Sequence, residues 1–304
     1  MRHRFALYTA YMTVFALILG NLVVATNAGD ACGTDWPICN GKIIPDFTQY
    51  KVLIEYSHRV FTSLLGFVIL LNFIFVWKRK YPNESSIKVW ALLTMVLLLV
   101  QSLVGALNVV WGTPPGFTTI DVTISLFLLM STVFLTTALQ RTRIRSDEKA
   151  RAENSRYRIL ITPAFLAFSL FFLEIIVGAF FKHSGASKIL HNIAANELLI
   201  SSASLSQFIY NVHGISNAII LISAAYLLFW SVRRRVLVKE SVSFFVLLVL
   251  NGVTGYLTQI SGLEEWTSSL HMIIVIVTVF QGAYLLSKSY FGPYYIAKLA
   301  ADGI

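Results

Sequence analysis

The chain has 304 residues, of which 56% are hydrophobic and only 13% are charged. A soluble domain carries about 25% charged residues, so this composition excludes an ordinary globular enzyme and indicates an integral membrane protein. The formal net charge of +9 could suit nucleic acid, but the basic residues cluster between apolar blocks, where they act as topology signals and lipid contacts. We therefore expect the lipid bilayer as a partner and no nucleic acid.

Eight apolar blocks follow one another, each near or above the roughly 20 residues that a helix needs to cross a membrane. They cover residues 5–27, 53–77, 89–111, 117–139, 159–181, 206–230, 242–260 and 266–288. No small-residue cleavage site follows the first block, which predicts a retained helix rather than a signal peptide, and no transit segment precedes it, which favours a prokaryotic cell membrane. The expected fold is an all-α integral membrane protein with eight transmembrane helices.

The basic residues alternate between the two ends of these helices. The N-terminus, the loops at 78–88, 141–158 and 233–239, and the C-terminal tail hold most of them. The other loops hold only five of the 24 Lys and Arg residues, namely Lys42, Lys51, Arg59, Lys182 and Lys188. Because positive residues stay on the cytoplasmic side, we expect both termini in the cytoplasm and the 28–52 and 182–205 segments outside.

The chain is predicted to contain two copies of a four-helix unit. Three positions recur after 150 or 155 residues: Gly105 and Gly255, Asp121 and His271, and His58 and His213. Both copies would start and end on one side, which predicts a pseudo-twofold axis along the membrane normal. The expected domains are an N-terminal four-helix bundle at 1–140, a basic cytoplasmic linker at 141–158 and a C-terminal four-helix bundle at 159–304.

Four titratable residues interrupt the apolar helices at one depth, each within about two turns of the external end. They are His58 and Asp121 in the N-terminal half, and His213 and His271 in the C-terminal half. Ionisable residues inside membrane helices are costly and mark functional sites by default. Each pair suits the two axial positions of a haem iron in a bundle core, although a membrane histidine can also simply bond a neighbouring helix. Asp121 is the weaker ligand and could instead hydrogen-bond His58 or a water.

Glu55 precedes His58 by three residues and therefore shares its helix face. It could exchange protons beside a bound group, or be an interfacial Glu favoured by the helix dipole. Arg59 could pair with a haem propionate or extend to the external headgroups. Glu174 could belong to a proton path or hydrogen-bond a neighbouring helix. Interhelical hydrogen bonds are expected from Gln101, Asn108, Asn251, Thr254 and Gln259, and His183 and His191 are expected to be exposed loop residues.

The only two cysteines, Cys32 and Cys39, lie in the first external segment. Two cysteines are too few for a disulfide scaffold or an iron–sulfur cluster, and their spacing is not the Cys-x-x-Cys of a thioredoxin-type centre. They could form a disulfide that closes a small loop over the first bundle, which an external compartment permits. Two free thiols are the alternative.

These residues together resemble the haem A synthase family. The stretch Cys32-Gly33-Thr34-Asp35-Trp36-Pro37-Ile38-Cys39 is similar to its loop signature, Cys-Gly-x-x-Trp-Pro-x-Cys. The stretch Glu55-Tyr56-Ser57-His58-Arg59 is similar to its helix signature, Glu-x-x-His-Arg. The duplicated eight-helix layout and the positions of His213 and His271 agree with the family as well.

The resemblance implies an oxidoreductase that converts a methyl group of haem O, through a hydroxylated intermediate, to the formyl group of haem A, the cofactor of certain terminal oxidases. His213 and His271 would ligate the iron of a resident haem b that passes electrons, and His58 would lie over the substrate haem. Glu55 would be essential to the chemistry, and Arg59 would meet a propionate. Expected partners are haem O, a haem O synthase, the assembly machinery of terminal oxidases, and a quinone or other membrane electron donor or acceptor, with a homo-oligomer left open.

The sequence departs from the family's pattern in two places. Asp121 stands where the family has a second histidine in the first half, so that His58 alone could hold the substrate haem, with an open or water-bound face. Members of the paired-cysteine type also have cysteines in the second long external loop, and this chain has none there. The resemblance therefore implies one external disulfide, between Cys32 and Cys39.

Two other classes of protein remain as alternatives. A membrane b-type cytochrome would carry electrons without modifying haem, and the weak Asp121 position favours it, but such a carrier needs neither Glu55 nor the cysteine loop. A transporter would use repeats and intramembrane charges, but transporter sites usually lie near the midplane. The four titratable residues are instead expected towards the external face.

Overall fold

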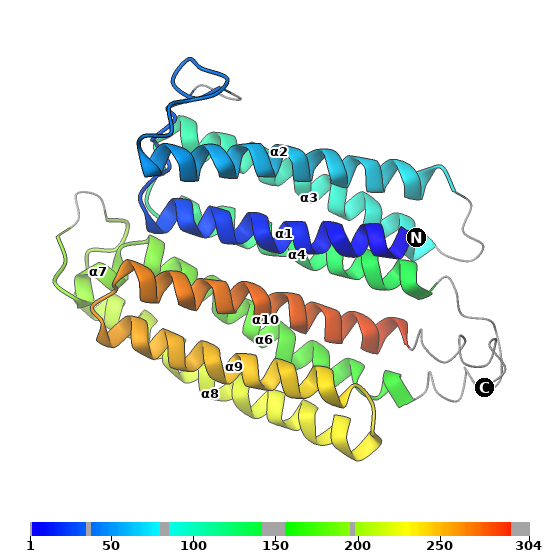
Figure 1. The fold of residues 1–304 in the computed structure, drawn as a ribbon. Coiled ribbons are helices and arrows are strands. Elements are labelled where there is room, and N and C mark those ends of the chain that lie inside the picture. The colour runs from blue at the N-terminus through cyan, green and yellow to red at the C-terminus, as the bar shows by residue number, and fades with distance from the viewer. Residues whose placement is uncertain (1, 35–37, 80–84, 142–155, 195–197, 293–304) are drawn as a thin grey trace.

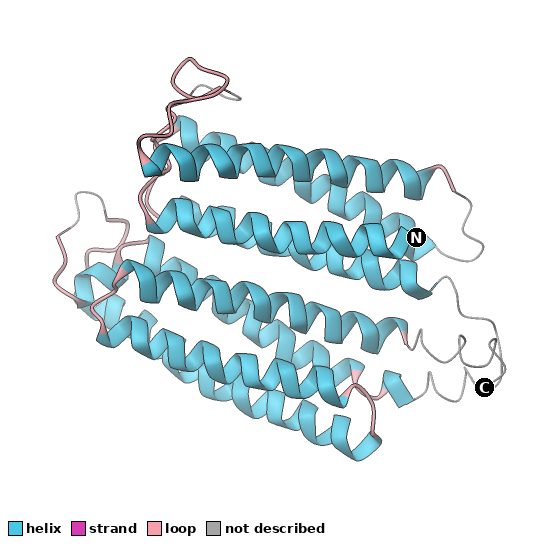
Figure 2. Cartoon of the chain, viewed as in Figure 1, coloured by secondary structure: helices cyan, strands magenta, loops and turns pink. Residues whose placement is uncertain are grey.

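The computed structural model of the chain describes residues 2–34, 38–79, 85–141, 156–194 and 198–292. Its long helices are α1 (Arg2–Ala25), α2 (Tyr50–Trp77), α3 (Ser85–Val110), α4 (Phe117–Arg141), α6 (Ile161–His183), α8 (Ala203–Arg234), α9 (Val238–Ile260) and α10 (Glu265–Phe291) (Figure 1). A short helix, α7 (Ala186–Leu190), lies between α6 and α8. Figure 2 shows that the elements of the described ranges are helices joined by loops at the two ends.

Each of the eight long helices contains a stretch that is long and apolar enough to cross a membrane. This confirms the predicted all-α membrane protein with eight spans. The helix ends lie within about four residues of the predicted ones; the block expected at 206–230, for example, is the helix Ala203–Arg234. Polar residues such as Ser204 and Arg233 continue the helix beyond its apolar part.

The helices form two groups that each close on themselves. In the first group α1 packs on α2, α2 on α3, α3 on α4, and α4 on α1; in the second, α6 packs on α8, α8 on α9, α9 on α10, and α10 on α6. Figure 1 shows the first group above the second. In the same view α1 begins and α10 ends at one end of the bundle, while the loops before α2 and around α7 lie at the other.

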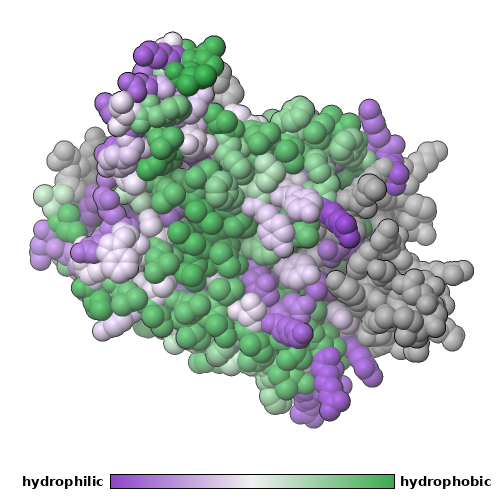
Figure 3. All heavy atoms as spheres, in the orientation of Figure 1, coloured by the Kyte–Doolittle hydropathy of each residue, from purple (hydrophilic) through white to green (hydrophobic). Residues whose placement is uncertain are grey.

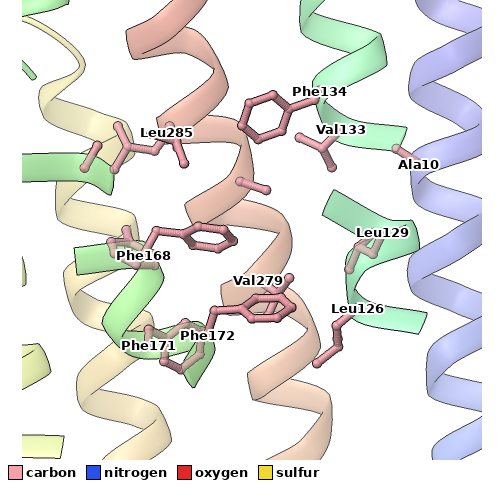
Figure 4. Close-up of a cluster of buried hydrophobic side chains, with 14 of the residues drawn as sticks. Ala10, Leu126, Leu129, Val133, Phe134, Phe168, Phe171, Phe172, Val279 and Leu285 are labelled. Carbon is pink, nitrogen blue, oxygen red and sulfur yellow. The ribbon is translucent and has the colours of Figure 1, made fainter. Parts of the chain in front are cut away.

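The main hydrophobic core lies where the two groups meet. Helices α1 and α4 contact α10 there, and α4 also contacts α6. The buried side chains labelled in Figure 4 include Leu129 and Val133 of α4, Phe168 and Phe172 of α6, and Val279 of α10. Accordingly, 67% of the most apolar stretch of α4 is buried inside the protein, against only 17% of that of α3.

The outer helices expose their apolar side chains. Large hydrophobic residues on α3, α8 and α9 are open on the surface, among them Leu99, Ile222 and Val246. Figure 3 shows hydrophobic side chains across the middle of one face and hydrophilic ones mainly towards its ends. A surface of this kind is stable in the hydrocarbon of a bilayer.

The segment 182–205 differs from the loop expected there. His183 is the last residue of α6 and is half-buried, and its carbonyl oxygen accepts a hydrogen bond from the backbone N–H of Gly116 at 2.8 Å. His191 directly follows α7 and is also half-buried. The prediction that both are exposed loop residues was wrong, because α6 continues past its apolar block and α7 folds back on α8.

Some predicted features lie outside the described residues. They include positions 142–155 of the expected linker, and Asp35, Trp36 and Pro37 of the loop signature.

Candidate functional site

The C-terminal half brings His213 of α8 next to Glu174 of α6. Oε1 of Glu174 lies 2.6 Å from Nδ1 of His213, and the two side chains are 9% and 21% exposed. Of the two roles left open for Glu174, the structure provides the contact with a neighbouring helix. A carboxylate at Nδ1 fixes the orientation of the imidazole and leaves Nε2, on the far side of the ring, to face a metal.

His271 of α10 has a neutral partner at the same ring atom. Its Nδ1 lies 3.0 Å from Oγ1 of Thr254 on α9. The Thr254 hydroxyl also lies 2.9 Å from the carbonyl oxygen of Leu250, to which it can donate its hydrogen. With that bond made, Oγ1 accepts from the Nδ1–H of His271 and leaves Nε2 unprotonated, the state that binds iron.

Each of the three predicted ligand histidines packs against a glycine of a neighbouring helix. A methyl group built on Gly20 would lie 3.2 Å from Cε1 of His58. The corresponding distances are 2.6 Å from Gly178 to His213 and 3.3 Å from Gly255 to His271. The helix pairs are α1 with α2, α6 with α8, and α9 with α10. At each position the imidazole fills the space that a larger side chain would need.

Nδ1 of His58 on α2 is buried and makes no well-aligned hydrogen bond among the described residues, and the same holds for Nδ1 of His213. His213 differs in having the Glu174 carboxylate 2.6 Å from that nitrogen. The ring of His58 packs instead against Gly20 of α1. His58 therefore stays a candidate ligand on the strength of its place in the helix.

Asp121 of α4 bonds to α3 rather than to His58. Its Oδ1 accepts from Nε2 of Gln101 at 2.5 Å, and its Oδ2 lies 3.5 Å from Nδ2 of Asn108. The interhelical role expected for Gln101 and Asn108 is thereby confirmed, as it is for Asn251, which donates to Thr278 of α10 at 2.6 Å. The carboxylate is therefore held by its neighbours on α3.

Glu55 and Arg59 form a buried pair on α2 that binds the first external segment. Oε2 of Glu55 accepts from the backbone N–H of Cys32 at 2.7 Å, and its Oε1 accepts from the Arg59 guanidinium at 2.5 Å. The same guanidinium donates to the carbonyl oxygens of Gly33 at 2.6 Å and Ile38 at 3.3 Å. Glu55 and Arg59 are only 3% and 8% exposed, so Arg59 does not extend to the external headgroups.

The segment that Glu55 and Arg59 bind is closed by its two cysteines. The sulfur atoms of Cys32 and Cys39 are paired, with Cα atoms 4.4 Å apart, and both side chains are fully buried. The hydroxyl of Tyr56 donates to the carbonyl oxygen of Ile43 at 2.6 Å and holds the next part of the segment against α2. The cysteine loop therefore rests on the helix that carries His58.

Sequence reasoning missed Lys182 as a residue near the site. Its Nζ donates to Oγ of Ser268 at 2.7 Å, which joins the end of α6 to the start of α10, three residues before His271. A basic residue in the last turn of an apolar helix was the available signal. Gly20 and Gly178 gave no comparable signal, because glycine is common in membrane helices.

A haem needs fewer protein ligands than a bare metal ion does. Within the described ranges, no three His, Cys, Asp or Glu side chains lie together as a set of metal ligands. A haem supplies the equatorial nitrogens itself and requires only axial ligands from the protein. His213 and His271, each fixed through Nδ1, offer two such ligands, and His58 offers one.

Comparisons with known proteins point to one family. The COX15-CtaA family, described as cytochrome oxidase assembly protein, matches residues 3–281. "Heme A synthase" from Halalkalibacterium halodurans is 29% identical over 276 residues, which cover 89% of this chain and 91% of that protein. "Heme A synthase" from Lysinibacillus sphaericus is 27% identical over 279 residues, 89% of each chain. The protein of that name from Exiguobacterium sibiricum is 30% identical over 191 residues, 62% of each chain.

Proposed function

Because the chain belongs to the COX15-CtaA family of cytochrome oxidase assembly proteins, we propose that it is a haem A synthase. It oxidises a methyl group of haem O, through a hydroxylated intermediate, to the formyl group of haem A, and so serves the biogenesis of terminal oxidases. The observation that carries this proposal is the match to proteins named haem A synthase along nearly the whole chain. The histidine positions on α2, α8 and α10 support it.

The C-terminal half holds the resident cofactor, which we assign as haem b. His213 and His271 would hold its iron through Nε2, while Glu174 and Thr254 would orient the two rings through Nδ1. Lys182, at the end of α6, would meet a propionate in exchange for its bond to Ser268. When bound, a haem with two imidazole ligands supplies one-electron transfer.

The N-terminal half holds haem O as the substrate. His58 would face it from α2, where its ring packs against Gly20 of α1 as the other two histidines pack against glycines. Glu55 accepts the protons that the methyl group loses as it is oxidised, because a carboxylate one helical turn from His58 can take up and pass on protons. Arg59 keeps that carboxylate in place through the 2.5 Å hydrogen bond, and its other donors fix the cysteine loop.

The cysteine pair forms a disulfide in the cell and holds the loop over the substrate half. The loop restricts access of water to Glu55, whose second oxygen binds the N–H of Cys32. When bound, the resident haem would supply one-electron transfer, and its partner would be a membrane electron carrier of the quinone class.

The protein spans a prokaryotic cell membrane with both termini in the cytoplasm and the haem sites towards the external face. The distribution of Lys and Arg supports this orientation. The two closed groups of four helices are copies related by an axis along the membrane normal. Their contacts repeat in the same order, and a histidine lies against a glycine in each.

A membrane b-type cytochrome that only carries electrons is the less favoured function. Such a carrier has no use for the buried ion pair of Glu55 and Arg59 beneath a closed loop. The relatives are also named haem A synthase and not cytochrome.

Expression in cells that by themselves make neither haem O nor haem A tests the function. Membranes are extracted and the haems are identified by chromatography and mass, with and without a co-expressed haem O synthase. Haem A should appear only when both proteins are present. Its absence, while haem O accumulates and the chain is stably inserted, would contradict the assignment.

A further inference from the structure

Three glycines contact a histidine of a neighbouring helix, but Gly105 of α3 does not. Gly255 of α9 lies against the His271 ring, but a methyl group built on its counterpart Gly105 of α3 would meet no atom within 4 Å. Gly105 lies 150 residues before Gly255, as Asp121 lies 150 before His271. In the N-terminal half, no ring occupies the space that the His271 imidazole fills in the C-terminal half.

Asp121 does not replace that imidazole, because its carboxylate is already bound to α3. Gln101 donates to its Oδ1 at 2.5 Å, and Nδ2 of Asn108 lies 3.5 Å from its Oδ2. Hydrogen bonds to an ionised group are stronger than those between neutral groups. The carboxylate would have to give up these bonds to reach an iron, and it is a shorter side chain than histidine.

The side-chain amides of Gln101 and Asn108 each have a carbonyl oxygen that accepts no hydrogen bond from the described part of the chain. With their NH₂ groups turned to Asp121, Oε1 of Gln101 and Oδ1 of Asn108 are buried and have no hydrogen-bond partner among the described residues. Such atoms in a membrane interior call for a donor that the protein does not provide. A water molecule or another small polar ligand can supply it.

We propose that the iron of the haem held by His58 has no protein ligand on its second face, and that this face takes a small exchangeable ligand, water or a diatomic gas. Gln101, Asn108 and Asp121 form the polar wall beside that ligand. The inference rests on the proposed function for the presence of the haem, but concerns only its coordination. The two haems of the protein then differ, one with two imidazoles and one with a single imidazole.

Carbon monoxide is the probe, because it binds ferrous haem only at an open axial position. The protein is purified with both haems from cells that make haem O, reduced, and titrated with carbon monoxide under a spectrophotometer. The wild type should bind about one carbon monoxide for every two haems. The ferric protein should also show one high-spin and one low-spin haem by electron paramagnetic resonance.

Two substitutions of Asp121 distinguish an open second face of the iron from a face that the Asp121 carboxylate occupies. Asp121→Asn retains the shape and cannot become an imidazole ligand, so carbon monoxide binding should stay at the wild-type level. Asp121→His places an imidazole opposite Gly105, where there is room for it, and should abolish carbon monoxide binding while the high-spin signal becomes low-spin.

Two results would overturn the inference. The first is a two-haem wild type that binds no carbon monoxide and is wholly low-spin. The second is an Asp121→Asn variant that gains carbon monoxide binding which the wild type lacks, because the carboxylate would then be the ligand. Extraction of haem A from the same samples shows whether the proposed synthase activity stands, independently of the coordination.

Discussion

The Glu174 carboxylate lies 2.6 Å from Nδ1 of His213, whereas Nδ1 of His271 lies 3.0 Å from the neutral hydroxyl of Thr254. The two proposed ligands of one haem therefore have partners of different charge. An imidazole that donates to a carboxylate becomes more electron-rich and stabilises ferric iron over ferrous iron. We therefore expect the α6–α8 contact to help set the reduction potential of the haem proposed there.

We expect Glu174→Gln to raise the midpoint potential of the resident haem. The amide oxygen can still accept the Nδ1–H, but the negative charge is lost. An effect of about tenfold on the reduction equilibrium corresponds to about 59 mV for one electron. Redox titration of the low-spin signal in purified protein measures the shift.

Thr254→Val is the matched control for this prediction. It removes the neutral partner of the other ligand, and should shift the potential much less than Glu174→Gln. If Glu174→Gln retains its low-spin haem and its potential is unchanged, Glu174 does not tune the iron.

Gly178→Ala should displace the resident haem. The added methyl group would lie 2.6 Å from Cε1 of His213, so the ring must move away from its present place. Overpacking of this kind costs about 1–3 kcal/mol, which corresponds to a roughly 5- to 150-fold loss of affinity. The ratio of low-spin haem to protein after purification measures it.

Gly214, which follows His213 in the chain, provides the control for Gly178→Ala. A methyl group on Gly214 meets nothing within 4 Å, so Gly214→Ala should retain the wild-type haem content. Equal haem content in Gly178→Ala and Gly214→Ala would show that the close approach of His213 to α6 does not matter for binding.

Replacing both cysteines by serine should impair the substrate half alone. The pair closes a loop with a sequence separation of 7, and loss of a disulfide across so short a loop costs about 2–3 kcal/mol. Without it, the N–H of Cys32 is no longer held at Glu55. We expect easier proteolysis between residues 28 and 48, and a severalfold lower yield of haem A.

The resident haem is the internal control for the double cysteine variant. Its low-spin spectrum should be unchanged, because His213 and His271 lie on helices that do not carry the loop. A parallel loss of the low-spin signal would mean that the loop supports the whole bundle rather than the substrate half.

The spans could be predicted from the sequence, and the candidate site residues could be singled out, because both depend on local properties. An apolar block of sufficient length is a membrane helix in almost any context, and a titratable residue within it stands out. The histidines on α2, α8 and α10 were found in this way. The offsets of 155 residues from His58 to His213 and of 150 residues from Asp121 to His271 also indicated the repeat.

The partners of those residues could not be predicted, because they depend on which helices become neighbours. Nothing in the spacing of Glu174 and His213 places α6 beside α8. Arg59 is turned inwards because the cysteine loop folds over α2 and offers carbonyl oxygens there. The helix α7 is only five residues long, too short to leave a periodic pattern.

The most direct measurement is chromatographic identification of the haems in protein purified from cells that make haem O, for the wild type and for Glu55→Gln. We predict haem A or its hydroxylated precursor beside haem b in the wild type. Glu55→Gln, which loses the charge paired with Arg59, should contain haem O in place of the product and retain haem b. Haem b alone in the wild type, with haem O available, would contradict the synthase assignment and leave a one-site cytochrome.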